Sequence, residues 1–208
     1  MKVVAINGSP RKDGNTSIAL KLMSEELIKE GIEVEIIQVG DKLLHGCIAC
    51  GYCFGSENHQ CVFNDDIMNE VSNKMREADG IILGSPTYYG GIAGTMKSFL
   101  DRAFYSSITG KNYRNKVATA VVSVRRAGGV DVYNQLNNYL SLAETVSPPS
   151  QYWVIGYGMD KGEILQDEEG IQTIKRNANA MAWLLKAIDS STEKLPRVEA
   201  GTMTNFIR

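Results

Sequence analysis

Apolar runs of strand length alternate with longer segments of helical periodicity along most of this 208-residue sequence. Such alternation is typical of parallel strands joined by crossover helices, because each crossover must return the chain to the same end of the sheet. The sequence predicts five strands, at residues 2–7, 33–39, 80–85, 117–124 and 151–156. Helices are predicted at residues 15–30, 65–78, 94–104, 131–142 and 168–187. We therefore expect one α/β domain over residues 1–188 and an unpatterned tail at 189–208.

Two of the predicted strands have different apolar patterns. Residues 33–39 alternate apolar with polar side chains, which indicates an edge strand with one face in water. Residues 80–85 are almost entirely apolar, as a central strand covered on both faces should be. A three-layer parallel sheet binds ligands beyond the carboxyl ends of its strands, where the direction of winding reverses. The loops after strands one, three and four are therefore the expected functional loops.

The loop after the first strand, GSPRKDGNTS at residues 8–17, opens a helix. Glycines, hydroxyls and free backbone N–H groups at a helix N-terminus favour a bound phosphate. The spacing is not that of a nucleoside-triphosphate loop, which needs a lysine after its second glycine, whereas Asn15 follows Gly14 here. The pattern therefore favours the single phosphate of a mononucleotide. The alternative is structural, with Asn15 or Thr16 capping the helix and the glycines making a turn.

The loops after strands three and four suggest a flat ligand. Residues 85–102 read SPTYYGGIAGTMKSFLDR, in which a proline, two tyrosines and a glycine pair let backbone and aromatic rings approach a planar group. The alternative is a glycine-containing loop with half-buried tyrosines. After strand four, the amides of residues 127–129 and one arginine, Arg126, could bind a carbonyl edge and stabilise negative charge there.

Charge and hydropathy exclude several classes of function. Twenty-two basic and 24 acidic residues give a net charge of −2, so no overall field attracts nucleic acid or an anionic membrane. The apolar run at the N-terminus ends at Asn7, which is too short for a signal-peptide core, and no later run approaches the length of a membrane span. We therefore expect a cytoplasmic protein with no nucleic-acid or membrane partner, and reduced thiols.

All four cysteines fall within an inserted segment at residues 44–64, as Cys47-x2-Cys50-x2-Cys53-x7-Cys61. Three thiolates at two-residue intervals can surround one face of a cube-like cluster while a fourth closes it, which is how a [4Fe–4S] centre is held. Zinc more often uses two separated pairs of cysteines, and a redox dithiol needs only two. Reduced thiols without a metal are a further alternative. His45 and His59 are interpreted as loop residues rather than ligands.

Together these strings resemble the flavodoxin-like NADPH-dependent FMN reductases over nearly the whole chain, and the cysteine spacing resembles their iron-sulfur flavoprotein branch. The resemblance implies a three-layer sandwich with a five-stranded parallel sheet of order 2-1-3-4-5 and a cysteine insertion after strand two. It implies that the FMN phosphate is held by Ser9, Arg11, Asn15, Thr16 and Ser17. The isoalloxazine ring would be bordered by Pro86, Thr87, Tyr88, Tyr89, Gly90 and Gly91. Its pyrimidine side would meet Ala127, Gly128 and Gly129.

The expected activity is that of an FMN-dependent oxidoreductase or electron-transfer flavoprotein. Electrons would come from NAD(P)H or a redox partner and pass to a quinone, flavin, metal or iron-sulfur acceptor, with no side chain acting as nucleophile. Related flavoproteins are commonly dimers or tetramers, and Tyr152, Trp153 and the tail could supply such contacts. A cluster could then approach a flavin across a subunit interface. The alternatives are an FMN-binding redox sensor without turnover and a zinc-stabilised interaction module.

Overall fold

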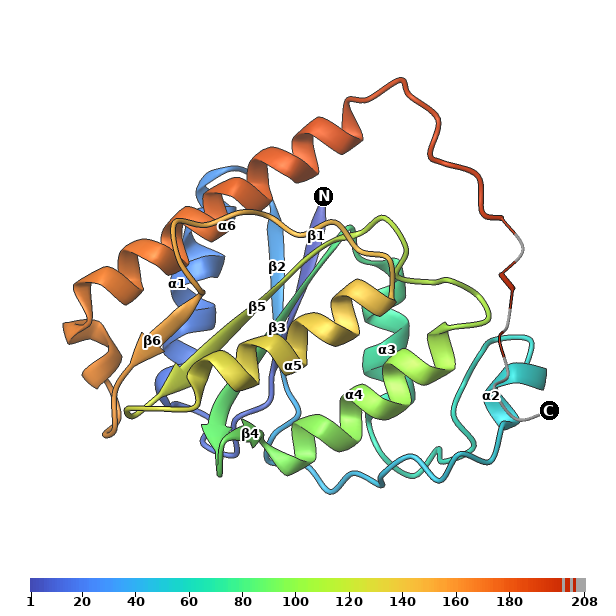
Figure 1. Cartoon of the computed structure of the whole chain (residues 1–208), viewed down its shortest axis with the longest axis horizontal. Coiled ribbons are helices and arrows are strands. Elements are labelled where there is room, and N and C mark those ends of the chain that lie inside the picture. Colours follow the sequence, from blue (N-terminus) through green and yellow to red (C-terminus); the bar gives the residue numbers. More distant parts are fainter. Residues whose placement is uncertain (200, 203, 205–208) are drawn as a thin grey trace.

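The computed structural model describes residues 1–199, 201, 202 and 204. Its central feature is a parallel sheet of order β2-β1-β3-β5-β6 (Figure 1). The parallel strands are β1 (Lys2–Asn7), β2 (Glu33–Gln38), β3 (Gly80–Tyr88), β5 (Val117–Val124) and β6 (Ile155–Tyr157). A two-residue strand, β4 (Gly91–Ile92), pairs antiparallel with the end of β3. With β4 set aside, the predicted order 2-1-3-4-5 is confirmed.

Helices cover both faces of the sheet. One face carries α1 (Asn15–Lys29) and α6 (Glu168–Asp189), and the other carries α3 (Met68–Glu77), α4 (Gly94–Ser107) and α5 (Gly129–Leu142) (Figure 1). Two short helical turns, α2 (Tyr52–Gly55) and the 3₁₀ helix η1 (Glu163–Gln166), lie in loops. None of the helices in the described ranges is long and apolar enough to cross a membrane.

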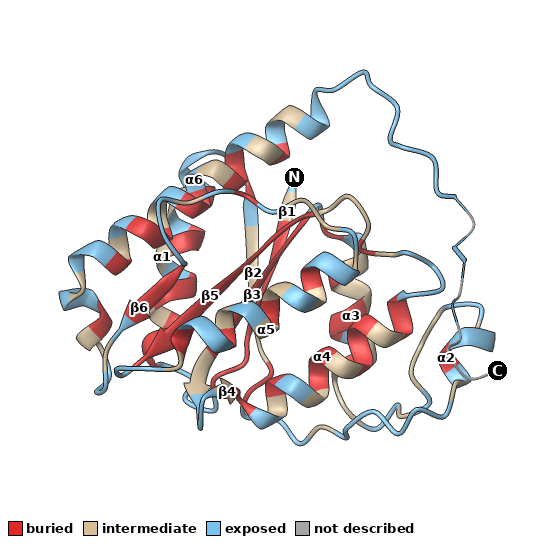
Figure 2. Cartoon of the chain, in the orientation of Figure 1, coloured by how far each residue is buried: buried red, intermediate tan, exposed pale blue. Residues whose placement is uncertain are grey.

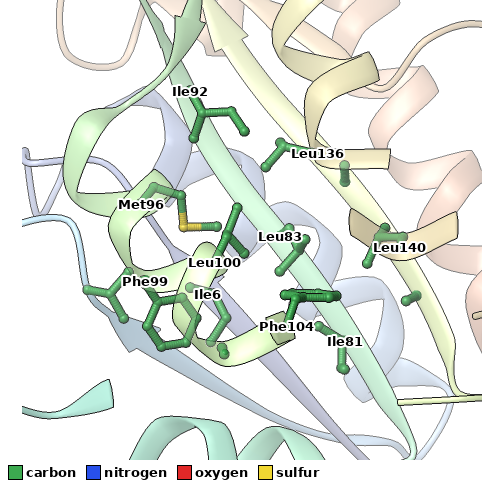
Figure 3. Packing of buried hydrophobic residues seen from close by; sticks show 14 of the residues in the cluster. Ile6, Ile81, Leu83, Ile92, Met96, Phe99, Leu100, Phe104, Leu136 and Leu140 are labelled. Carbon is green, nitrogen blue, oxygen red and sulfur yellow. The ribbon is translucent and has the colours of Figure 1, made fainter. Parts of the chain in front are cut away.

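The core is divided into two apolar clusters by the sheet. Buried residues are concentrated on β1, β3 and β5, whereas β2 is mostly intermediate, as expected for an edge strand (Figure 2). On one face, side chains of α4 and α5 pack over Ile6, Ile81 and Leu83 of the sheet (Figure 3). The three central strands are therefore held rigidly, and the loops at their carboxyl ends start from fixed positions.

Three element boundaries differ from the sequence prediction. The last strand was predicted at 151–156 but begins at Ile155, because Gln151 and Tyr152 form an exposed bend. The helix predicted from residue 65 begins at Met68, whose N–H donates to the Asp66 carboxylate at 3.0 Å. Strand β3 runs past Ser85 to Tyr88 because its end pairs with β4 in a hairpin.

The cysteine segment and the tail lie outside the sandwich layers. The segment leaves the end of β2 and runs beside α4 to α2, before it returns to α3 (Figure 1). Beyond Asp189, the described tail residues are exposed and form no helix or strand, and the carbonyl of Pro196 accepts a hydrogen bond from Arg114 Nη1 at 3.1 Å. The remaining tail residues, 200, 203 and 205–208, lie outside the described residues. The domain limits at 188 and 189 stay a prediction.

Candidate functional site

The turn between β1 and α1 leaves the start of a helix open. Ser9 Oγ accepts a hydrogen bond from the backbone N–H of Arg11 at 3.1 Å, and α1 follows with Gly14 at its N-cap. Within the described chain, no side chain caps this helix end. The structural alternative of Asn15 or Thr16 as a side-chain cap is therefore not what the structure has. Uncapped N–H groups and the positive end of the helix dipole are available to an anion.

This helix start opens into a cavity of about 190 Å³ at the carboxyl ends of the strands. Seven of the sequence-predicted residues line it together, namely Ser9, Arg11, Asn15, Thr16, Pro86, Thr87 and Tyr88. Seven further lining residues were not predicted, namely Pro10, Gly14, Ser123, Val124, Arg125, Gly158 and Met159. The turn after β1 and the end of β3 therefore meet at one site, as expected from the topology.

Two side chains of the α1 start connect that site to other strands. Thr16 Oγ1 and Ser123 Oγ lie 2.6 Å apart and are both buried, which joins α1 to the end of β5. Asn15 is engaged at both ends of its amide, because Nδ2 donates to Asp160 O and Oδ1 accepts from Gly162 N–H, each at 3.0 Å. Asn15 thus holds the loop after β6 against the cavity. Ser17 is buried in the first turn and does not line the cavity.

The hydroxyl of Thr87 is buried without a hydrogen-bond partner in the described part of the chain, although Thr87 lines the cavity. An unpaired buried hydroxyl is uncommon, because it loses its bond to water and gains nothing in return. A ligand in the cavity that carries an acceptor or donor would satisfy it. A ligand that can form hydrogen bonds therefore suits this cavity better than a purely apolar one.

The tyrosine and glycine residues after β3 form a tight hairpin beside the cavity. Thr87 pairs with Ile92, and Tyr88 pairs with Gly91, so Tyr89 and Gly90 make the two-residue turn. Both turn residues have positive φ, +50° and +73°, which is the requirement of a type I′ turn. Tyr89 is fully exposed, and Tyr89, Gly90 and Gly91 do not line the cavity.

The loop after β5 differs from its prediction. Arg125 lines the cavity, whereas Arg126, Ala127, Gly128 and Gly129 do not. Gly128 nevertheless lies against the hairpin, since a Cβ there would come within 3.2 Å of Thr87 Cγ2 and 3.3 Å of the Gly90 Cα. Its φ of +85° also suits glycine. Of the predicted residues in this loop, Gly128 therefore lies next to the hairpin turn.

The loop after β6 was missed by the sequence analysis. Gly158 and Met159 line the cavity because β6 ends at the same edge as the other parallel strands. The signal was present in the sequence as YGMDKG at residues 157–162, directly after an apolar strand. The prediction considered only the strands next to the winding reversal, and so excluded this loop.

The four cysteines form a second site. Cys47, Cys50, Cys53 and Cys61 are all free thiols and all line one pocket beside α4, together with Arg102 and Tyr105 among others. Burial, and then the nearby thiols of Cys61, Cys47 and Cys50, raise the pKa of Cys53. Four thiolates gathered in this way repel one another, and a bound cationic centre removes that penalty.

The thiols do not converge on a single point. Among the described residues, no three His, Cys, Asp or Glu side chains are close enough to bind one metal ion together. A zinc ion would need four sulfur atoms about 2.3 Å from one centre, whereas a cube-like cluster takes each thiolate at a different corner. The arrangement of the four thiols, which could each meet a different corner, therefore fits the cube-like centre better than the zinc alternative.

One residue of this site was missed by the sequence analysis. Arg102 of α4 is 1% exposed, and its Nε lies 3.2 Å from the sulfur of Cys61. Burial acts to raise the pKa of its ion-pair partner Asp66, but hydrogen bonds from Arg102 and from the Met68 N–H outweigh burial and hold that pKa below its usual value. The string SFLDR gave no sign of this, because an arginine on a helix is normally solvated.

The chain is similar to known proteins over most of its length. The sequence profile of the NADPH-dependent FMN reductase family matches residues 1–160. An iron-sulfur flavoprotein of Methanocaldococcus jannaschii is 36% identical over 195 residues, which cover 90% of this chain and 99% of that protein. An NADPH azoreductase of a Bacillus species is 26% identical, over 80% of this chain and 84% of that protein.

Solved structures share the fold. The structure of RosB, with a bound 8-demethyl-8-formylriboflavin-5′-phosphate intermediate, superimposes with a TM-score of 0.64 at 18% identity. The match covers 100% of this chain and 94% of that one. At this identity the likeness concerns the arrangement of strands and helices, and it confirms the predicted flavodoxin-like architecture.

Proposed function

Because the chain belongs to the NADPH-dependent FMN reductase family, and within it to the iron-sulfur flavoproteins, we propose that it binds FMN in the cavity over β1, β3 and β5 and transfers electrons through it. The observation that carries this proposal is the cavity itself, which is lined by an uncapped helix start and by Thr87, whose buried hydroxyl has no partner among the described residues. The electrons come from NAD(P)H or a redox partner and pass to a small-molecule or protein acceptor. The relative named as an NADPH azoreductase supports NADPH as the donor.

The residues of the chain bind and orient the cofactor. The amides at the start of α1 and the hydroxyl of Ser9 would hold the phosphate, and Arg11 or Arg125 would add positive charge. Pro86, Thr87 and Tyr88 would flank the ring system at the end of β3. When bound, FMN supplies two-electron exchange with a hydride donor and one-electron exchange with a metal centre. The protein contributes position and electrostatics.

We further propose that the four cysteines hold a [4Fe–4S] cluster. The support is their common pocket, the repulsion among their thiolates and the iron-sulfur flavoproteins among the relatives. Such a centre would supply one-electron transfer. The cysteine pocket and the cavity share no lining residue. We propose that electron exchange between the two sites occurs between subunits of a homo-oligomer.

Anaerobic purification followed by an absorption spectrum and by iron and sulfide analysis tests the two cofactors separately. We expect flavin bands, iron and sulfide, and oxidation of NADPH in the presence of a quinone, ferric or flavin acceptor. Flavin without iron would leave the reductase and remove the cluster. A colourless protein with bound zinc would overturn both proposals in favour of an interaction module. Flavin without turnover would favour a redox sensor.

The ligand assignment is tested by Cys50→Ala. This variant should lose the broad iron-sulfur absorption and keep the flavin bands, because Cys50 lines only the cysteine pocket. Ser56→Ala, in the same segment, is the matched control and should keep its iron. Iron retained at the wild-type level in Cys50→Ala would contradict the assignment.

The flavin position is tested by Thr87→Val, which removes the unpaired hydroxyl and keeps the shape of the side chain. We expect FMN affinity to fall by about tenfold, because the hydroxyl loses its ligand partner, while the apoprotein becomes no less stable. Ser24→Ala is the control, since Ser24 Oγ is also buried and unpaired in the described chain but lies outside the cavity. Equal FMN affinity in wild type and Thr87→Val, measured by flavin fluorescence quenching, would count against this placement.

The oligomer is tested by sedimentation equilibrium of the loaded protein. We expect a dimer or tetramer, with the exposed Tyr152 and Trp153 or the tail at the contacts. Trp153→Glu should lower the mass, because a charge at a subunit contact is costly. A wild-type monomer at working concentration would exclude electron exchange between subunits.

A further inference from the structure

We propose that Arg102 is a positioning residue that tunes the cysteine site, because it donates an N–H···S hydrogen bond to Cys61 and thereby raises the reduction potential of the cluster held there. This inference rests on the proposed cluster. Arg102 touches the ligand and not the reacting group, so its effect would pass through the sulfur of Cys61. Hydrogen bonds to ligating sulfurs favour the more negative, reduced state of an iron-sulfur centre.

The guanidinium of Arg102 is fully buried, and each of its N–H groups has a hydrogen-bond acceptor. Its side chain has no exposed surface, and its five N–H groups match five contacts. The Nη atoms donate to both carboxylate oxygens of Asp66 and to the carbonyls of His45 and Phe63. The fifth group, Nε–H, donates to Cys61 Sγ at 3.2 Å. The orientation of the planar fork is therefore fixed, and the direction of the Nε–H bond is fixed with it.

These partners lie at the two ends of the cysteine segment. His45 precedes the first cysteine, whereas Cys61 and Phe63 lie at the last one, just before α3. The backbone of Cys61 is also held by Asn69 of α3, whose amide exchanges two hydrogen bonds with it at 2.9 and 3.0 Å. Because Asn69 already holds the main chain of Cys61, the hydrogen bond from Arg102 is not needed to position that backbone, and its effect is on the sulfur.

The surroundings strengthen this contact. The Phe63 ring lies 5.4 Å from the guanidinium carbon of Arg102 and stacks on His45, with ring centroids 4.4 Å apart. Aromatic rings and burial keep water away from the guanidinium, and a hydrogen bond is stronger where the local dielectric constant is low. Cys53 and Cys61 are the less exposed of the four thiols. The contact therefore falls on a part of the site that solvent screens weakly.

Asp66 determines the direction in which the reduction potential should shift when either partner of the ion pair is changed. Its buried carboxylate balances most of the charge of Arg102, so the directional Nε–H bond is the main effect left at the sulfur. Removing that bond while keeping the positive charge should lower the potential. Neutralising Asp66 while keeping the bond should raise it, because the cluster then meets an uncompensated positive charge.

The test is a potentiometric titration of the anaerobically loaded protein, followed by absorbance and electron paramagnetic resonance. In Arg102→Lys the ammonium keeps the charge but has no Nε–H. We expect the equilibrium constant for one-electron reduction to fall by about tenfold, which lowers the reduction potential by about 59 mV. In Asp66→Asn the potential should shift in the opposite direction. Lys97→Gln is the control, because Lys97 also lies on α4 and pairs with Asp101, away from the cysteines.

Shifts of the reduction potential in opposite directions in Arg102→Lys and Asp66→Asn would support the inference. A merely structural role would give loss of iron, with no change of potential in the protein that still holds a cluster. Unchanged potentials in both fully loaded variants, or a negative shift in Asp66→Asn, would overturn it. If Arg102→Lys takes up no iron, Arg102 has a structural role at the site and the inference is overturned. A wild-type protein without iron would instead overturn the proposed cluster and this inference with it.

Discussion

Single buried hydroxyls show how the local surroundings of a residue decide its contribution. Thr16 and Ser24 both lie on α1, and both are buried. Thr16 bonds Ser123 across to β5, whereas the Ser24 hydroxyl has no partner in the described residues. A satisfied buried hydroxyl stabilises the fold, and an unsatisfied one costs free energy. Both residues carry a buried hydroxyl on the same helix, so neither the functional group nor burial alone distinguishes them.

This contrast gives a prediction on stability. Thr16→Val should lower the free energy of unfolding by about 1–3 kcal/mol, because it leaves Ser123 unpaired as well. Ser24→Ala should change the free energy of unfolding little or increase it slightly. Urea denaturation of the apoproteins measures both. Similar losses in the two variants would show that the Thr16–Ser123 contact contributes nothing specific.

At the scale of the element, the β3–β4 hairpin borders the cavity at the strand ends. It extends the central strand by three residues beyond Ser85 and turns on Tyr89 and Gly90. A φ of +50° is unfavourable for tyrosine, and such backbone strain is often kept at functional sites. Nothing lies within 4 Å of a Cβ placed on Gly90, so the turn selects glycine for its backbone and not for space.

Tyr89→Asn should therefore stabilise the apoprotein by about 1 kcal/mol, because asparagine tolerates the left-handed region better. Thermal and urea denaturation provide the measurement. Tyr88→Asn is the matched control, since Tyr88 is extended and paired with Gly91, and it should lower stability. A destabilised Tyr89→Asn would mean that the tyrosine ring makes a contact worth more than the strain.

The whole molecule places its two candidate sites on different elements. The cavity uses strand ends, and the cysteine pocket uses the flank of α4. A third, mostly apolar cavity of about 300 Å³ lies between the ends of α4 and α5, lined by Tyr113 and Tyr139 among others. None of the sequence-predicted site residues lines it. Tyr139 joins α5 to α4 through its hydrogen bond to Asp101.

This contact makes the stability of the molecule depend on alkaline pH. Burial, followed by the hydrogen bond to Asp101, raises the pKa of Tyr139 to about 12. An unfolded tyrosine ionises near pH 10, so the unfolded state loses its proton first and stability should fall as pH rises from about 10 to 12. Tyr139→Phe should flatten this part of the profile. Urea midpoints of the wild type and of Tyr139→Phe, measured at pH 8 and pH 11, test this. The same fall in midpoint between the two pH values in both proteins would contradict it.

Much of the fold could be predicted from the sequence. Periodicity identified the five parallel strands and the helices between them, because apolar spacing reports which face of an element is buried. Glycines at 90 and 128 were expected in close loops, and both have positive φ. The last strand was placed four residues early, because the apolar character of residues 152–154 does not show that Gln151 and Tyr152 form an exposed bend.

The site was predicted in part for a similar reason. Ser9 and Thr87, which follow predicted strands in the sequence, both line the cavity, and their contact with FMN stays a prediction. Arg125 was not distinguished from Arg126, since a turn of one residue reverses which of the two faces the cavity. Met159 was missed because it approaches from β6, far along the chain. The tail and the subunit contacts stay predictions.

The sequence by itself determined the alternation of strands and helices and the presence of four thiols in one segment, because these follow from local spacing. Strings of neighbouring residues carried the resemblance to the family, and the order of the sheet was implied by that resemblance. Only the tertiary structure decided that Arg102 is buried against Cys61, that Thr16 bonds Ser123 and that the Thr87 hydroxyl has no partner among the residues described. Each of these depends on contacts between residues distant in the chain, and periodicity contains no information about which distant partners meet.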